Sequence, residues 1–294
     1  MMKHHNFAAF ILTHGRADKV LTYHALMKSG YTGRVIILID DEDKSRADYE
    51  KKFGDMVCVF DKKEIAKTFD NGDNSGERRA IVFARNACFE IAKNMGLEHF
   101  VQLDDDYIDF RFKRDENGKH IVESKTTRFI RVKKIDELFD LMIDFVEQTG
   151  ASGISLAQGG DFIGGKGNVL AQNEMTFPRK CMNTWICATS RPFTFVGRMN
   201  EDVTAYVVEG HRGLLFGMMT HAAINQVGTQ KAAGGMTSVY QDNGTYIKSF
   251  FTILYAPSCT TIRVIGQIYP RLHHRIKWNN AVPKIVSEDI KKIE

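Results

Sequence analysis

The sequence has no apolar run that approaches the roughly 20 residues needed to cross a bilayer. The segment Phe7–Leu12 is too short for the apolar core of a signal peptide and leads directly into polar residues. The five cysteines are scattered, odd in number and without a CxxC pair, which argues against a disulfide framework and against a structural zinc site. These absences predict a cytoplasmic protein with no membrane partner.

The composition is that of a globular protein, with 43% apolar and 26% charged residues in a chain long enough to bury a large core. The net charge is only +4, but basic residues concentrate in two stretches. Residues 111–134 contain nine Lys or Arg against three acids, and residues 263–294 contain seven against three. Such stretches can meet a polyanion, and the common alternative is a solvated basic surface.

Short apolar runs alternate with helical patterns in the first half of the chain. Strands are expected at residues 7–13, 34–39, 56–60 and 99–103, and helices at 19–29 and 77–95. The second helix has the clearest apolar stripe, and Gly96 supplies its stop. This alternation predicts an α/β fold with a mostly parallel central sheet flanked by helices.

The second half is less regular. Helices are expected at 135–148 and 201–209, strands at 153–157, 183–189 and 213–220, and ordered elements at 247–255 and 261–265. Two glycine-containing loops, 159–172 and 230–244, are predicted to be mobile without ligand, and at least one of them is expected to become ordered over the bound donor. Without a linker or repeat, we expect one domain over residues 1–260 and a C-terminal extension over 261–294.

Three consecutive carboxylates, Asp104, Asp105 and Asp106, follow a buried strand. Side chains alternate along an extended chain, so Asp104 and Asp106 point the same way and can offer hard oxygen ligands to Mn²⁺ or Mg²⁺. Open α/β sheets bind ligands at the carboxyl ends of their strands, where this turn lies. The alternative is a solvated acidic loop.

Two further polar groups suit the same site. Glu201 and Asp202 open a predicted helix, where a carboxylate across a cleft could deprotonate a hydroxyl, whereas Asn200 is expected to cap that helix. Arg78 and Arg85 share a helix face that could meet a diphosphate, although a solvent-exposed face explains Arg78 equally well.

The order of these parts resembles the GT-A glycosyltransferases over roughly residues 6–225. The resemblance is carried by the first strand, Asp40, Ala84-Arg85-Asn86-Ala87, the triple acid and Glu201-Asp202. It implies that Thr13 and Arg16 lie by the nucleotide base and phosphates, with Asp40 at the base or ribose. It also implies further donor contacts at Arg85, Asp104 (ribose) and Asp105.

The same resemblance implies that Asp106 holds the metal. It makes Asp202 the catalytic base in an inverting transfer, with Glu201 orienting the acceptor. A histidine after a later strand often completes the metal site in this family. His221 is the candidate for that ligand and His211 its rival, although a single histidine is more often structural.

A narrower resemblance is to phage TET-associated glycosyltransferases, which glycosylate 5-hydroxymethyl-pyrimidines in DNA. It is carried by Thr13-His14-Gly15-Arg16, Leu103–Tyr107, Asn200–Val203 and Gln230–Met236. It implies a UDP-sugar donor, with glucose or arabinose favoured, and hydroxymethylcytosine in double-stranded DNA as acceptor. Lys231 would reach the diphosphate. The host would be a phage-infected bacterium.

The segment Tyr269–Trp278 interleaves basic and aromatic residues without one acid, which suits phosphate contacts and stacking on an extruded base. The DNA-binding residues it predicts are Arg271, Arg275, Lys277 and Trp278. The alternative is that this segment packs on the domain. The sequence leaves the oligomeric state open.

Other functions remain open at this point. The same transfer onto a polysaccharide or lipid-linked acceptor is the nearest alternative. A nucleotidyltransferase also uses paired acids and a metal, but Thr13-His14-Gly15-Arg16 is a poor phosphate-binding loop for one. A non-catalytic DNA-binding module would bind DNA without transferring any sugar.

Overall fold

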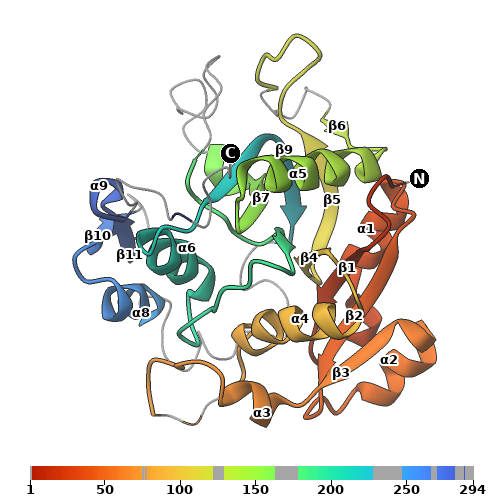
Figure 1. Cartoon of the computed structure of the whole chain (residues 1–294), viewed down its shortest axis with the longest axis horizontal. Helices are drawn as coiled ribbons and strands as arrows, with labels where there is room; N and C mark the ends of the chain where they lie inside the picture. The colour runs from red at the N-terminus through yellow and green to blue at the C-terminus, as the bar shows by residue number, and fades with distance from the viewer. Residues whose placement is uncertain are drawn as a thin grey trace.

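The computed structural model describes residues 2–74, 76, 78–121, 129–162, 178–227, 247–265, 270–281 and 288. Its centre is a nine-stranded sheet in the order β3-β2-β1-β4-β8-β7-β9-β5-β6 (Figure 1). The strands are β1 (Phe7–Leu12), β2 (Arg34–Asp40), β3 (Val57–Phe60), β4 (His99–Asp104), β5 (Tyr107–Phe112), β6 (Ile130–Arg131), β7 (Gly153–Gln158), β8 (Trp185–Ala188) and β9 (Phe216–Gln226).

The sheet is mostly parallel, as predicted. β1 pairs in parallel with β2 and β4, β2 with β3, and β7 with β9. β8 runs antiparallel to both β4 and β7, and β5 runs antiparallel to β9 and β6. The carboxyl ends of β1, β2 and β4 therefore meet at one edge, which is where the acidic turn begins.

Helices cover both faces of this sheet (Figure 1). They are α1 (Leu21–Lys28), α2 (Arg46–Phe53), α3 (Lys62–Ala66), α4 (Val82–Asn94), α5 (Ile135–Thr149), α6 (Glu201–His211), α8 (Ile247–Tyr255) and α9 (Trp278–Ala281). Three short 3-10 helices join them: η1 (Ala17–Lys19), η2 (Gly54–Met56) and η3 (Gly159–Phe162). The helix predicted from residue 77 begins at Val82, and α2, α3, β5 and β6 were not predicted.

The sheet separates two apolar cores. Along β1, Ala9 and Ile11 face a core shared with α5, while Phe10 and Leu12 face a core shared with α4 and α6. Because side chains alternate along a strand, only a strand covered on both faces is apolar at every position. That arrangement explains the unbroken sequence FAAFIL and fixes the first strand at the centre of the fold.

A second, two-stranded sheet is formed by the antiparallel pair β10 (Thr260–Ile265) and β11 (Arg271–Ile276). Together with α8 and α9 it forms the C-terminal module, residues 247–281, which lies against α6 (Figure 1). The predicted domain boundary at residue 260 coincides with the first residue of β10 and stays a prediction. Within the described ranges, no helix combines the length and apolarity needed to span a membrane.

Two glycines end their helices in the same way and give a matched test of the fold. Gly30 after α1 (φ +78°) and Gly96 after α4 (φ +69°) both occupy the left-handed position of a Schellman motif. A Cβ on Gly30 would lie 2.7 Å from the backbone oxygen of Lys133, whereas a Cβ on Gly96 meets no atom within 4 Å.

We expect Gly96→Ala to lower the free energy of unfolding by about 1 kcal/mol, the usual cost of a left-handed alanine. Gly30→Ala should cost at least about 1 kcal/mol more, because a clash with backbone adds to that strain. Urea unfolding of both variants measures the difference. Equal losses would contradict the packing of α1 against the segment before α5.

Candidate active site

The acidic turn joins β4 to β5, and its three carboxylates have different surroundings. Asp105 is 2% exposed and is held by two donors. The Thr13 hydroxyl donates to it at 2.6 Å and the Arg16 guanidinium lies 3.1 Å away. Burial raises the pKa of Asp105 to about 6 in spite of these partners. Thr13 and Arg16 therefore fix the turn from the loop after β1.

Asp104 is held from α4. The Arg85 guanidinium donates at 3.0 Å to Asp104 through Nη2 and at 3.0 Å to Glu201 through Nε. Arg85 is only 1% exposed, and its guanidinium is paired with two carboxylates inside the protein. The prediction that Arg85 meets the diphosphate is therefore wrong. Arg85 joins the acidic turn to the start of α6 and is a positioning residue.

Glu201 is the other partner of Arg85. It is 8% exposed and accepts a hydrogen bond from Arg85 inside the protein, so its predicted role of orienting the acceptor stays a prediction. Burial, and then the neighbouring charge of Asp202, raise the pKa of Glu201 to about 7 although Arg85 opposes the shift. Burial likewise raises the pKa of Asp104.

Asp106 is the third carboxylate of the acidic turn. It is half-buried, and no described side chain donates a hydrogen bond to it. Burial and the charges of Asp104 and Asp105 raise its pKa to about 7. A hard divalent cation is the ligand that such crowded carboxylate oxygens fit. Among the described residues, no group of three or more His, Cys, Asp or Glu side chains is placed to hold a metal ion, so the metal site at Asp106 stays a prediction.

His221 does not belong to this site, and its assignment as a metal ligand is wrong. The β5–β9 register pairs Tyr107 with Gln226, and the amide of Val227 donates to the carbonyl of Asp106. His221 lies five positions back from Gln226, roughly 15 Å at the usual rise of a strand. The rival His211 ends α6, where its Nδ1 lies 3.0 Å from the carbonyl oxygen of Asn280.

The start of α6 is unusual. Asn200 occupies the N-cap position but has a left-handed backbone (φ 57°) and makes no capping hydrogen bond. Its side chain donates instead to Thr252 at 2.6 Å, and Nδ2 lies 3.4 Å from Nδ1 of His274. The expected cap is therefore absent. Asp202 itself accepts the backbone N–H of Val203 at 2.7 Å.

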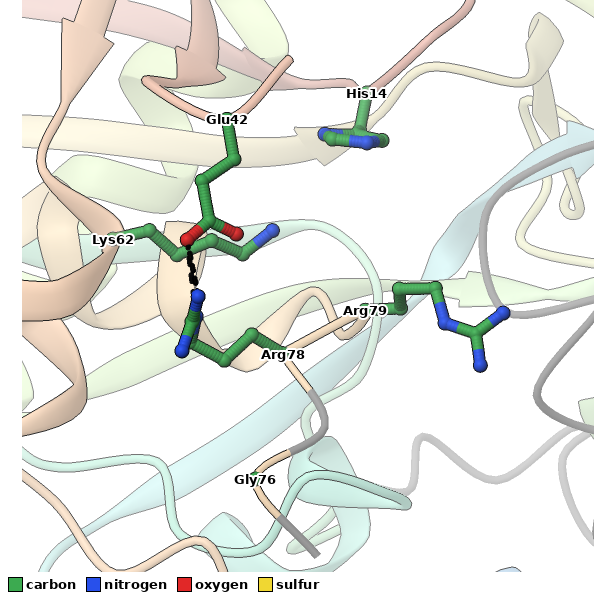
Figure 2. A pocket seen from close by; sticks show the side chains of 6 residues that line it. All are labelled: His14, Glu42, Lys62, Gly76, Arg78 and Arg79. Atoms are coloured by element: carbon green, nitrogen blue, oxygen red, sulfur yellow. Dashed lines mark hydrogen bonds and ion pairs between the residues drawn. The ribbon is translucent and has the colours of Figure 1, made fainter.

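A cavity of about 260 Å³ lies beside the acidic turn, lined by His14, Glu42, Lys62, Gly76, Arg78 and Arg79. Figure 2 shows these residues, which come from the ends of β1 and β2, from α3 and from the segment before α4; Arg78 points to Glu42, whereas Arg79 points away from the other side chains. Glu42 accepts from Arg78 at 2.5 Å. His14 directly follows Thr13, so the cavity adjoins the acidic turn.

Asp40 binds two of the side chains that line this cavity. It is buried and accepts from His14 at 2.7 Å and from Lys62 at 3.2 Å. Burial would raise the pKa of Asp40, but these two donors hold it below its usual value, and the hydrogen bond to Asp40 raises the pKa of His14. The cavity thus presents His14 and Lys62, where the sequence had pointed to Asp40.

Lys62 and Glu42 were not predicted as site residues. Both follow the carboxyl ends of strands, Lys62 after β3 and Glu42 after β2, which is the signal that could have found them.

The predicted DNA-binding residues lie on the C-terminal module. Arg275 and Lys277 are exposed. Trp278 is 37% exposed and stacks on Tyr206 with 5.8 Å between ring centroids, so one of its faces packs on the domain. The side chain of Arg271, Lys231, and most of the two predicted mobile loops lie outside the described residues.

The sequence from residue 7 to residue 235 matches the family model of the TET-Associated Glycosyltransferase. That match spans most of the chain and includes the acidic turn and the start of α6. The chain belongs to the TET-associated glycosyltransferase family. It is therefore a glycosyltransferase, and its sheet and acidic turn form a glycosyltransferase fold. The C-terminal module lies beyond the matched residues.

Other comparisons add less. The search of curated proteins finds no match. Among solved structures, apo mouse xyloside xylosyltransferase 1 is similar with a TM-score of 0.33 and 12% identity, over 95% of this chain and 99% of that chain. A likeness at that level carries no inference about the reaction of this family member.

The raised pKa values of the acidic turn predict how stability depends on pH. A carboxyl whose pKa is raised by folding stabilises the folded state while it is protonated, and this contribution is lost as the pH rises through the folded value. For Asp105, Asp106 and Glu201 those values are about 6 and about 7. The metal-free protein should therefore lose stability as the pH rises from about 4, near the ordinary pKa of these carboxyls, to about 7.

Asp106→Asn removes one of the crowded charges. In chelator, we expect the variant to melt above the parent at pH 8 and to show a flatter pH dependence, while it binds UDP with Mn²⁺ more weakly. Asp48→Asn, at an exposed position of α2, is the control. A melting temperature and a Mn²⁺-dependent UDP affinity that are both unchanged in Asp106→Asn would contradict the assignment.

Proposed function

We propose that this TET-associated glycosyltransferase moves a sugar from a UDP-sugar, with Mn²⁺ or Mg²⁺, to 5-hydroxymethylcytosine in double-stranded DNA, with inversion at the anomeric carbon. The observation that carries the donor half is the acidic turn. No described side chain donates a hydrogen bond to Asp106, and burial together with two neighbouring carboxylates raises its pKa to about 7, although a backbone hydrogen bond opposes the shift. Such a group favours a cation that arrives with the substrate.

The nucleotide end of the donor fits the cavity beside the turn. His14 and Lys62 offer hydrogen-bond donors there, and Glu42 offers an acceptor. The volume of about 260 Å³ suits a base and ribose, while the diphosphate extends toward Asp104 and Asp106. The divalent cation would neutralise charge on the departing diphosphate.

The acceptor side begins at α6. Asp202 takes the proton of the acceptor hydroxyl, whose oxygen forms the bond to the anomeric carbon as the bond to the UDP oxygen breaks. Val203 fixes one oxygen of Asp202, and the other is left for the incoming proton. Arg85 keeps Asp104 and the start of α6 at a fixed separation, so donor and base are held together.

Two observations support DNA as acceptor. The family model is that of a TET-associated glycosyltransferase, and the resemblance to that group implies a 5-hydroxymethyl-pyrimidine in DNA as acceptor. The C-terminal module adds exposed cations at Arg275 and Lys277. Glucose and arabinose are the favoured sugars. A polysaccharide acceptor remains the alternative for the same chemistry.

Replacing Asp202, the proposed base, distinguishes an effect on donor affinity from an effect on the turnover number. Asp202→Asn should bind UDP and Mn²⁺ almost as the parent does, while its turnover number falls by roughly 10²–10⁴, the range for a lost general base. Single-turnover transfer and UDP titration measure the two effects. Loss of donor binding would make Asp202 a ligand, and unchanged turnover would place the base elsewhere.

The acceptor is tested directly by transfer. Incubation with a panel of UDP-sugars and Mn²⁺ should add sugar to hydroxymethylated duplex and none to unmodified duplex, as measured by the mass of the digested nucleosides. Arg275→Ala with Lys277→Ala should flatten the salt dependence of duplex binding by about one to two in log–log slope. Lys51→Ala with Lys63→Ala, exposed on α2 and α3, removes the same charge elsewhere. No incorporation with any sugar would rule out the DNA acceptor.

A further inference from the structure

The C-terminal module contacts the protein at the residue that opens α6. Asn200 donates to Thr252 of α8, and its Nδ2 lies near Nδ1 of His274 on β11. Thr204 joins the same cluster, with its hydroxyl 2.9 Å from the Asn200 carbonyl and 3.2 Å from the Thr252 hydroxyl. Asn200, Thr204 and Thr252 are buried, so these bonds form out of reach of water.

These contacts alter how α6 begins. The side chain of an N-cap asparagine normally accepts the backbone N–H two or three residues on, here that of Asp202 or Val203. In this structure the module draws the Asn200 side chain away, and the Val203 N–H is accepted by the Asp202 carboxylate at 2.7 Å. Capping by Asn200 and orientation of Asp202 therefore compete for one donor.

The backbone agrees with this competition. Asn200 is left-handed, a conformation that asparagine tolerates better than other residues with a side chain but that is not the extended backbone of an ordinary N-cap. The contacts to its side chain come from Thr252 and His274. His274 accepts from Asn200 only as a neutral imidazole, and burial together with nearby cations lowers its pKa to about 3, which keeps it neutral.

We propose that Thr252 and His274 are positioning residues, which hold the Asn200 side chain off the helix cap and so leave the Val203 N–H to orient the Asp202 carboxylate. The C-terminal module, which lies beyond the matched family region, thereby becomes part of the acceptor half of the site. This inference rests on the proposed role of Asp202 as base.

The test begins with the protein alone. Thr252→Val and His274→Phe should each speed hydrogen exchange at the amides that follow Val203 in the first turn of α6, Thr204 first, by about five-fold or more, because the Asn200 carbonyl that accepts from the Thr204 amide is no longer held in place. Thr252→Ser keeps the hydroxyl and should restore the parent rate. Thr149→Val, which removes a hydroxyl bond at the end of α5, should leave these amides unchanged.

The second arm measures transfer. Thr252→Val should lower kcat by about five- to ten-fold, the effect of one misplaced hydrogen bond, with the KM for donor unchanged. Adding Asn200→Gly should recover part of that loss, because glycine accepts the left-handed backbone and has no side chain to compete for Val203. A merely structural role predicts the opposite, a further loss in the double variant.

The outcomes separate the two proposals. If the parent transfers no sugar, the proposed function fails and the exchange arm alone decides whether the module holds the start of α6. Unchanged exchange in both Thr252→Val and His274→Phe would overturn the inference. So would faster exchange without a fall in kcat, or a double variant worse than Thr252→Val.

Discussion

The buried guanidinium of Arg85 is the interaction on which the site depends. It binds two carboxylates that are far apart in the sequence, Asp104 at the end of β4 and Glu201 at the start of α6. Removal of one partner from a buried ion pair strands a charge and typically costs about 3–5 kcal/mol. The position of the acidic turn relative to α6 is thus set by one side chain of α4.

Around Arg85, the carboxylates of the acidic turn and of the start of α6 outnumber the arginine side chains that are paired with them. Arg85 and Arg16 serve Asp104 and Asp105, yet burial still raises the pKa of both, and Asp106 is raised further by its neighbours. Crowding of this kind destabilises the unliganded protein and is relieved by a cation. In the proposed function, the cost to stability and the affinity for a metal-bound donor would have the same origin.

The fold was largely predictable because its signals are local. β1 is recognisable from its unbroken run of apolar residues, and α4 from an apolar stripe that ends at Gly96. β5 was missed because it follows the acidic turn with no spacer. β11 was interpreted as a binding segment because its charges obscure an alternation of Leu272, His274 and Ile276, which is a strand signal.

The site was predictable in its residue types but less so in its pairings. The acidic turn and Asp202 were predicted from strand ends and helix starts, and their roles stay predictions. The sequence could not show that Arg85 turns inward, since its partner Glu201 is 116 positions away. Nor could it show that His221 lies at the far end of a strand pair, because that depends on the β5–β9 register.

The most direct test of the account is the number of protons released when Mn²⁺ and UDP bind. Calorimetry at pH 6.5 in buffers of different ionisation enthalpy measures it. A carboxyl with a pKa of about 7 is mostly protonated at that pH, so Asp106 should release a proton to the buffer on binding, less so at pH 8.5, and not in Asp106→Asn. Binding that releases no proton at pH 6.5, or the same number in the variant, would contradict the claim that the acidic turn holds the metal.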